Sequence, residues 1–213
     1  MLEHLLDIDE TPYLLNSTVD EDIVFTNDNY KLKFLRLDTT EFKGNVTFDH
    51  TNLKCGIYFH KCAFYGNLNF EGVKIDEFGN ILHETHESLI FEECTFYGKV
   101  VFSKNCSILR NLVFKNQCEF YKSFEFVNSF ITEGSLYIED SSFKSIVDIQ
   151  RSHFSSQLTI SNSKVSSVVR IVSSNANTIS FTGDNEFQRG RIELCQVENG
   201  GFLMMASLTE IGK

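Results

Sequence analysis

Apolar residues recur along this chain in a unit of eleven to twelve residues that begins near Ile23 and continues almost to the C-terminus. Each unit holds one apolar residue and, a few positions later, an apolar pair separated by a single residue. Three successive copies show it most clearly: Phe42 with Val46 and Phe48, Leu53 with Ile57 and Phe59, and Phe64 with Leu68 and Phe70. A pair at this spacing is typical of a short strand that points two side chains to one face. The pattern therefore predicts many very short strands joined by tight corners.

The units form two interleaved ladders of inward-pointing positions. The first ladder has another apolar residue two positions before most rungs, and its rungs are Phe25, Leu37, Phe48, Phe59, Phe70, Phe91, Phe102, Phe114, Phe126, Ile138, Ile149, Ile160, Ile171, Phe181, Leu194 and Met204. The second ladder prefers a small residue two positions before each rung, and its rungs are Tyr30, Phe42, Leu53, Phe64, Ile75, Phe96, Ile108, Phe120, Phe130, Phe143, Phe154, Val165, Ala176, Phe187, Val197 and Leu208. Two unlike faces are therefore expected to alternate.

Alternating steps of about five and six residues exclude a helix of 3.6-residue period. They also argue against a left-handed coil, which needs a uniform step of six. One unit cannot bury its apolar face alone, but stacked units share a continuous core. We therefore predict an all-β right-handed parallel β-helix of about eight coils, each of about 22 residues. Residues 1–22 are expected to form an acidic cap, 23–208 the β-helix and 209–213 a C-terminal tail. Corner glycines with positive φ are expected at Gly44, Gly66, Gly98 and Gly134.

The second ladder resembles the repeat of the pentapeptide-repeat proteins, in which a small residue stands two positions before a large central one. The matching segments are Cys62-Ala63-Phe64, Cys94-Thr95-Phe96, Cys118-Glu119-Phe120 and Ser152-His153-Phe154. The similarity covers about residues 23–208. The five-plus-six step and the additional large residues depart from the family pattern, so the chain looks like a variant with one wider corner. The resemblance implies a fold without catalytic residues, and some family members protect DNA gyrase by imitating duplex DNA.

The repeat is interrupted once, between Ile75 and Phe91. The motif Cys-x-Phe-Tyr begins at Cys62, Cys94 and Cys118. The last two copies are 24 residues apart and the first two are 32 apart, which is one coil plus about ten residues. We therefore expect an inserted loop at about 76–88 that leaves the columns in register. Loops on rigid scaffolds often carry function, and the candidate interaction residues in this loop are Asp76, Glu77, His83, Glu84, His86 and Glu87.

The formal net charge of −10 is unevenly distributed. Residues 1–22 carry −7, residues 71–93 carry −6, and the remainder carries +3. Imitation of duplex DNA requires a continuous negative surface in place of the phosphates. Two acidic patches on a rod of mixed charge fit that role poorly, so a DNA-mimic function is kept as the alternative.

No catalytic, cofactor or metal site is predicted. Four of the six cysteines occupy the small inward position, where a thiol acts as an apolar filler. The segment from His83 to Glu87 is one residue short of the zinc motif H-E-x-x-H and lies in a loop rather than on a helix. A solvated polar loop is the more economical interpretation. Recognisable nucleophile and phosphate-binding motifs are absent from the sequence, so we do not expect an enzyme.

Two surface features suggest contacts with other molecules. Tyr65, Tyr97 and Tyr121 follow their rungs directly and are expected to stack on three neighbouring coils. Tyrosine is enriched at protein interfaces, but a stack of rings also stabilises a ladder, and the sequence leaves both interpretations open. At the C-terminal end, the apolar residues that could seal the last coil or hold a homodimer are Phe202, Met204 and Met205.

The chain has no apolar run of the length that a membrane helix needs. Its first residues lack the basic start and apolar core of a secretory signal, so we expect a cytoplasmic protein without membrane or direct nucleic-acid contacts. The sequence predicts a non-enzymatic scaffold that binds an unidentified protein partner. The alternative is a DNA-mimic modulator of DNA gyrase, another topoisomerase or another DNA-binding protein.

Overall fold

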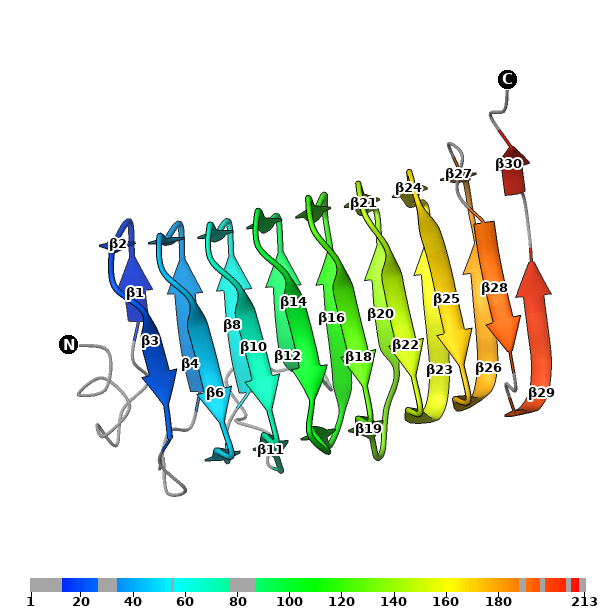
Figure 1. The fold of residues 1–213 in the computed structure, drawn as a ribbon, viewed down its shortest axis with the longest axis horizontal. Helices are drawn as coiled ribbons and strands as arrows, with labels where there is room; N and C mark the ends of the chain where they lie inside the picture. Colours follow the sequence, from blue (N-terminus) through cyan, green and yellow to red (C-terminus); the bar gives the residue numbers. More distant parts are fainter. Residues whose placement is uncertain are drawn as a thin grey trace.

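The chain folds as a right-handed parallel β-solenoid (Figure 1), which confirms the predicted fold class. The computed structural model describes residues 13–26, 34–54, 56–76, 87–187, 191–195, 198–205 and 208–210. Coils of about 23 residues are stacked in about seven turns, against roughly eight expected. Every strand pair recorded among these residues is parallel, and the described part of the chain contains strands without helices.

Each coil passes through four faces that belong to three sheets. The first face is a longer strand of sheet A: β1 (Tyr13–Leu15), β4 (Phe34–Asp38), β8 (Gly56–His60), β12 (Glu87–Glu92), β16 (Asn111–Lys115) and β20 (Leu136–Glu139). The second is a short strand of sheet B: β2 (Thr18–Val19), β5 (Glu41–Phe42), β9 (Ala63–Phe64), β13 (Thr95–Phe96), β17 (Glu119–Phe120), β21 (Ser142–Phe143), β24 (Lys164–Val165), β27 (Asn185–Phe187) and β30 (Leu208–Glu210).

The third and fourth faces complete the coil. Sheet C contains β3 (Ile23–Phe25), β6 (Val46–Asp49), β10 (Leu68–Glu71), β14 (Val100–Ser103), β18 (Phe124–Val127), β22 (Val147–Gln150), β25 (Val168–Val172) and β28 (Arg191–Cys195). The fourth face returns to sheet A through β7 (Asn52–Leu53), β11 (Lys74–Ile75), β15 (Ser107–Ile108) and β19 (Phe130–Ile131). In the later coils this short strand continues into the next first-face strand as β23 (His153–Ser161), β26 (Asn175–Thr182) and β29 (Glu198–Met205).

The core is built from columns of identical side-chain positions. In β6, Val46 and Phe48 are buried while Thr47 between them is partly exposed, which is the alternation that a strand requires. Phe48 stacks between Phe25 and Phe70, with ring centroids 4.5 and 4.8 Å away. Because these separations equal the spacing of neighbouring strands, each ring covers the next without a change of rotamer. The spacing of hydrophobic residues in the sequence therefore follows from the stacking of equivalent positions in successive coils.

The insertion leaves the columns in register. β11 ends at Ile75 and pairs with β7 and β15, and β12 begins at Glu87 and pairs with β8 and β16. In sheet B, Phe96 lies opposite both Phe64 and Phe120. The extra residues therefore enter at the corner between β11 and β12, while residues 77–86 lie outside the described part. At the N-terminal end, β1 and β2 already pair with the solenoid within the segment that we assigned to a cap.

The structure corrects the predicted register at one internal rung. Ile131, rather than Phe130, pairs with Ile108 and is fully buried. Ser129 is also fully buried and fills the small inward position two residues earlier. Because strand side chains alternate, a buried Ser129 places Phe130 on the outer side of β19. The step from the rung Phe120 to the next rung, Ile131, is therefore eleven residues, as elsewhere in the repeat.

The C-terminal rungs are also shifted. Phe181 pairs with Met205 instead of Met204, and Phe187 pairs with Glu210 instead of Leu208. The pairing of β26 with β29 contains an irregularity, because one residue of β26 lies opposite two residues of β29 between the flanking pairs. Such a bulge moves all following positions by one. The predicted rungs Tyr30 and Val197 lie outside the described residues.

The expectation of positive φ at the four corner glycines is wrong. Positive φ occurs instead at Gly72 and Gly183 and at non-glycine corner residues such as Lys61 and Glu93, both at 53°. Gly98 is required for a different reason: a Cβ there would lie 2.1 Å from the carbonyl oxygen of Gly66. These glycines permit close approach of backbones in successive coils.

Candidate interaction surface

Three exposed tyrosines form a column at the corner that follows sheet B. Tyr65, Tyr97 and Tyr121 come directly after β9, β13 and β17. The backbone N–H of Tyr97 donates to the carbonyl of Phe64 at 2.8 Å, and that of Tyr121 donates to Phe96 at 2.9 Å. The sheet ladder thus fixes the backbone of each tyrosine one coil from the next. The expected stack on three neighbouring coils is observed.

The three rings stack face to face. The centroids of Tyr65 and Tyr97 are 4.8 Å apart with an interplanar angle of 15°, and those of Tyr97 and Tyr121 are 5.0 Å apart at 23°. Each of the three residues is about 40% exposed. Since the ring faces cover one another, the column presents ring edges and hydroxyl groups to solvent. We call these three residues the tyrosine ridge.

Lysines continue the column beyond both ends of the ridge. At the N-terminal end, the Nζ of Lys43 lies 3.8 Å from the centroid of the Tyr65 ring and forms an ion pair with Glu41. At the other end, the backbone N–H of Lys144 donates to the carbonyl of Phe120, which places Lys144 one coil beyond Tyr121. The order along the column is therefore lysine, three tyrosines, lysine.

The flanks of the ridge differ between its two ends. Beside Tyr65 and Tyr97 the outward positions are small, with Ala63 and Thr95 on one side and Gly66 and Gly98 on the other. Beside Tyr121 they are charged. The Tyr121 hydroxyl donates to Oε2 of Glu119 at 3.0 Å, a bond that raises the pKa of Tyr121, and Lys122 follows on the other side.

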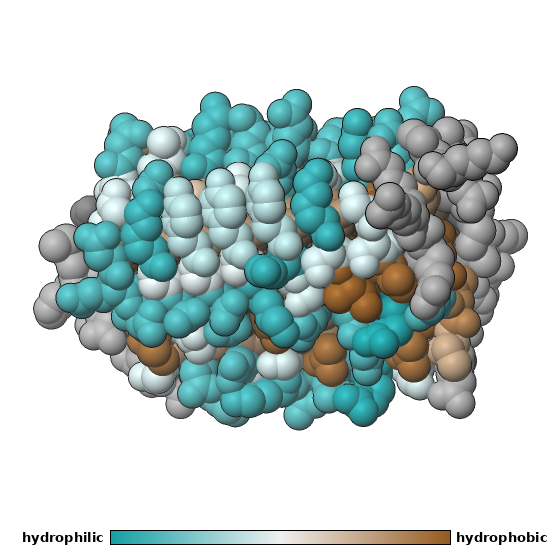
Figure 2. Space-filling model, turned by 45° about the horizontal axis from the view of Figure 1, so that its top comes forward, coloured by the Kyte–Doolittle hydropathy of each residue, from teal (hydrophilic) through white to brown (hydrophobic). Residues whose placement is uncertain are grey.

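The face seen in Figure 2 is largely hydrophilic. Apolar side chains gather on it toward the C-terminal coils, where Leu194 of β28 is 37% exposed. Among the residues whose burial is described, the other exposed large apolar side chains outside the ridge are Leu15 and Val24, in the first coil. The ridge is thus a cluster of exposed aromatic rings in the middle of the rod, separate from the apolar residues near its ends.

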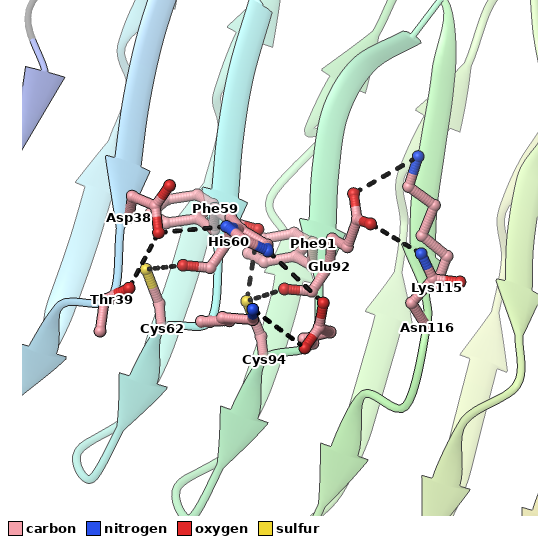
Figure 3. A network of polar contacts seen from close by, with 12 residues as sticks. Asp38, Thr39, Phe59, His60, Cys62, Phe91, Glu92, Cys94, Lys115 and Asn116 are labelled. Carbon is pink, nitrogen blue, oxygen red and sulfur yellow. Dashed lines mark hydrogen bonds and ion pairs between the residues drawn. The ribbon is translucent and has the colours of Figure 1, made fainter. Parts of the chain in front are cut away.

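A polar network joins three coils on sheet A (Figure 3). Nδ1 of His60 lies 3.1 Å from Oδ1 of Asp38, and its Nε2 lies 3.5 Å from Oε1 of Glu93. Thr39 and Arg36 also donate to the Asp38 carboxylate. Burial favours the neutral form of Asp38, but these hydrogen bonds outweigh it and hold the pKa at about 2.

Glu92 extends this network toward the next coil. Its carboxylate accepts hydrogen bonds from the Tyr58 hydroxyl and from Nδ2 of Asn116, both at 2.6 Å, and it lies 3.6 Å from Nζ of Lys115. Burial opposes ionisation of Glu92, yet these bonds lower its pKa; burial and the bond to Glu92 raise the pKa of Tyr58. Several side chains hydrogen-bond to each of the carboxylates of Asp38 and Glu92, so the network joins neighbouring coils.

The cysteine column is part of the core. The thiols of Cys62, Cys94 and Cys118 each donate to a carbonyl oxygen of the preceding coil at 3.4 Å. Burial raises the pKa of Cys94 well above its usual value and that of Cys106 to about 12. The thiols of Cys94 and Cys106 are therefore poor nucleophiles at neutral pH.

Many of the residues predicted for the inserted loop lie outside the described part of the chain: Glu77, His83, Glu84 and His86. Asp76 is described and forms an ion pair with Lys74 at 2.8 Å, and the backbone of Glu87 begins β12. Phe202, Met204 and Met205 belong to β29, whose backbone pairs with β26, but their side chains are not described. Within the described ranges, His, Cys, Asp and Glu form no cluster that could hold a metal.

The ridge and the inserted segment lie at different corners of the coil. The ridge follows sheet B, whereas the segment 76–88 joins β11 to β12 within sheet A (Figure 1). The residues that flank the inserted segment, Ile75 and Glu87, thus lie at another corner of the coil than the ridge. The lysines at the ridge ends and the network around His60 were not predicted from the sequence. The network around His60 could have been predicted, because Asp38, His60 and Glu92 occupy equivalent positions at the ends of three paired strands.

Comparison with known proteins finds no matching family, no matching curated protein and no matching solved structure. The part of the chain that is described has no helix long and apolar enough to cross a membrane. The protein is therefore classified by its fold alone, as a parallel β-solenoid that carries a tyrosine ridge on its surface.

Proposed function

We propose that this protein is a non-enzymatic scaffold, a variant of the pentapeptide-repeat architecture, that binds a protein partner through the tyrosine ridge. The observation that carries the proposal is the stack of Tyr65, Tyr97 and Tyr121 on the surface of a rigid rod. Tyrosine contributes large contact area at low conformational cost and is frequent at binding hot spots.

Preorganisation supports this role. A side chain that binding immobilises costs about 0.5–1.5 kcal/mol of rotamer freedom. The tyrosines are already held by ring stacking, by the sheet B ladder and, at the ends, by Lys43 and Glu119. A partner that packs on the ridge therefore meets a surface with little freedom left to lose.

The ridge suits a protein better than a nucleobase or a flat sugar. Bases bind to aromatic side chains through open ring faces. Here the faces between Tyr65, Tyr97 and Tyr121 are occupied by one another, and Lys43 lies over the outer face of Tyr65. Ring edges and hydroxyl groups remain, which accept aliphatic contacts and hydrogen bonds from a polypeptide.

The test is a quantitative pull-down from an extract of the source cells. The intact chain is compared with a variant in which all three ridge tyrosines are replaced by serine, and with Tyr137→Ser on sheet A as the matched control. We expect at least one protein that the intact chain and the control retain and that the ridge variant loses. Identical captured proteins for all three chains would contradict the proposal. A fourth chain that lacks residues 77–86, between β11 and β12, reports separately on the inserted segment.

A further inference from the structure

The charges around the ridge indicate what kind of protein segment it accepts. Lys122 and Lys144 lie beside and beyond Tyr121, both are exposed, and neither forms an ion pair with a described residue. The other lysines near the ridge are engaged, since Lys43 pairs with Glu41 and Lys99 with Glu125. The C-terminal end of the ridge thus has two cations available for a ligand.

We infer that the ridge binds an extended acidic segment of a partner protein, with carboxylates at Lys122 and Lys144 and apolar side chains along the tyrosine edges. This inference rests on the proposed function and specifies the partner's chemistry. The net charge of −10 does not oppose it. Fields from distant carboxylates are screened over about 8 Å at physiological salt, so the local lysines dominate at this end.

The dimensions of the column fit such a segment. Lys43 and Lys144 are separated by four coil steps, and steps of about 4.8 Å give ~19 Å. An extended chain that rises about 3.3 Å per residue covers this length with about six residues. The small residues Ala63, Thr95, Gly66 and Gly98 leave both flanks of Tyr65 and Tyr97 free of bulky side chains. An extended chain can therefore lie against the edge of the rings.

A second copy of this chain fits the ridge less well. A two-fold axis through Tyr97 and perpendicular to the rod would bring Lys43 opposite Lys144. A two-fold axis parallel to the rod would bring each lysine opposite its own copy. The parallel arrangement places Lys122 and Lys144 opposite their own copies, which disfavours association. In the perpendicular arrangement Lys144 meets a Lys43 that already pairs with Glu41, so it gains no carboxylate of its own. An acidic partner instead supplies carboxylates to Lys122 and Lys144.

The experiment is a selection of random peptides displayed on phage against the intact chain, followed by anisotropy measurements with labelled copies of the enriched peptides. We expect enrichment in Asp and Glu, and at least a tenfold weaker binding to the double variant Lys122→Glu, Lys144→Glu. The double variant Lys122→Arg, Lys144→Arg should bind as the native chain does. Lys54→Glu, at an exposed corner after β7, is the charge-reversal control.

A Tyr97→Ser variant distinguishes protein binding by the ridge, which is the proposed function, from the recognition of an acidic segment, which is the further inference. If it weakens binding while Lys122→Glu, Lys144→Glu has no effect, the ridge binds protein but the acidic partner is wrong. If Tyr97→Ser binds every enriched peptide as tightly as the native chain, both proposals fail. Failure to enrich any peptide, or enrichment of peptides without Asp and Glu, would also overturn the inference. Circular dichroism of each variant shows whether the β-solenoid is intact.

Discussion

The imidazole of His60 in β8 hydrogen-bonds to the carboxylate of Asp38 in β4, with Nδ1 and Oδ1 3.1 Å apart. The two residues lie opposite each other in the ladder of sheet A, so the bond joins successive coils. Asp38 is 7% exposed. A carboxylate in this position links the stacking of the solenoid to pH.

Low pH should lower the unfolding free energy of the solenoid, in part because the Asp38 carboxylate becomes protonated. Its pKa is lowered from 3.8 to about 2, because hydrogen bonds from His60, Thr39 and Arg36 outweigh the effect of burial. A depressed pKa contributes stability above the unfolded pKa and loses it as pH falls through the folded one. We expect Asp38→Asn to reduce the fall in unfolding free energy between pH about 4 and about 2, measured by urea titration. Asp140→Asn, the same substitution at an exposed corner, is the matched control.

Gly98→Ala should destabilise the fold although it adds one methyl group. The new Cβ would lie 2.1 Å from the carbonyl oxygen and 2.4 Å from the carbonyl carbon of Gly66, and backbone atoms in a paired coil cannot move aside. We expect a loss of about 1–3 kcal/mol or more in unfolding free energy.

Gly72→Asn is the matched control for this change. Gly72 has φ of 61°, and residues at the same corner in other coils adopt similar values, His50 at 48° and Asn128 at 47°. The nearest atoms to a new Cβ belong to the movable His50 ring. A change of about 0.5 kcal/mol or less is expected. Equal losses for Gly98→Ala and Gly72→Asn would contradict the backbone-contact explanation.

Phe96→Ala should cost about 3–5 kcal/mol, the usual range for a large core aromatic. The Phe96 ring is fully buried between Phe64 and Phe120, with centroids 5.3 and 4.7 Å away, so its removal leaves a cavity inside the column. Phe130→Ala should cost clearly less, because Phe130 lies on the outer side of β19. Thermal and urea unfolding compare the two. A larger loss at Phe130 would argue for the register that the sequence suggested.

Thiol labelling should distinguish the cysteines. The described cysteines are free thiols, of which Cys195 is exposed and Cys62, Cys94, Cys106 and Cys118 are buried. We expect a water-soluble maleimide to modify Cys195 in the folded protein and the four buried residues only after unfolding, as located by peptide mass spectrometry. Rapid modification of Cys94 in the native protein would show that the core opens.

A supercoiling assay with DNA gyrase tests the DNA-mimic alternative. Surface carboxylates in the described coils are often paired with lysines, for example Glu71 with Lys104 and Glu125 with Lys99. Such a surface lacks the unbroken negative charge of a phosphate backbone. We expect no effect on supercoiling at micromolar concentrations. Inhibition of gyrase, or its protection from an inhibitor, that weakens as the salt concentration is raised within the working range of the enzyme would revive that function, because contacts that imitate phosphates depend on salt.

Part of the candidate site could be read from the sequence. The rungs Phe64, Phe96 and Phe120 share a motif, so the tyrosine after each had to occupy equivalent corners. Lys43 and Lys144 lie outside the motif, but each directly follows a rung of the same ladder, Phe42 or Phe143, so the repeat held the signal for their place. Their place follows from backbone pairing of the coils before and after it.

The sequence by itself determined the architecture. A strand exposes alternate side chains to one face, so a short apolar period with one proline and many phenylalanines admits a stacked parallel coil and little else. Only the tertiary structure decided which residues meet across coils. The length of each coil sets the partner of every residue, and a shift of one position exchanges Phe130 for Ile131 or Met204 for Met205. The contact of His60 with Asp38 depends on that long-range register, which no local pattern contains.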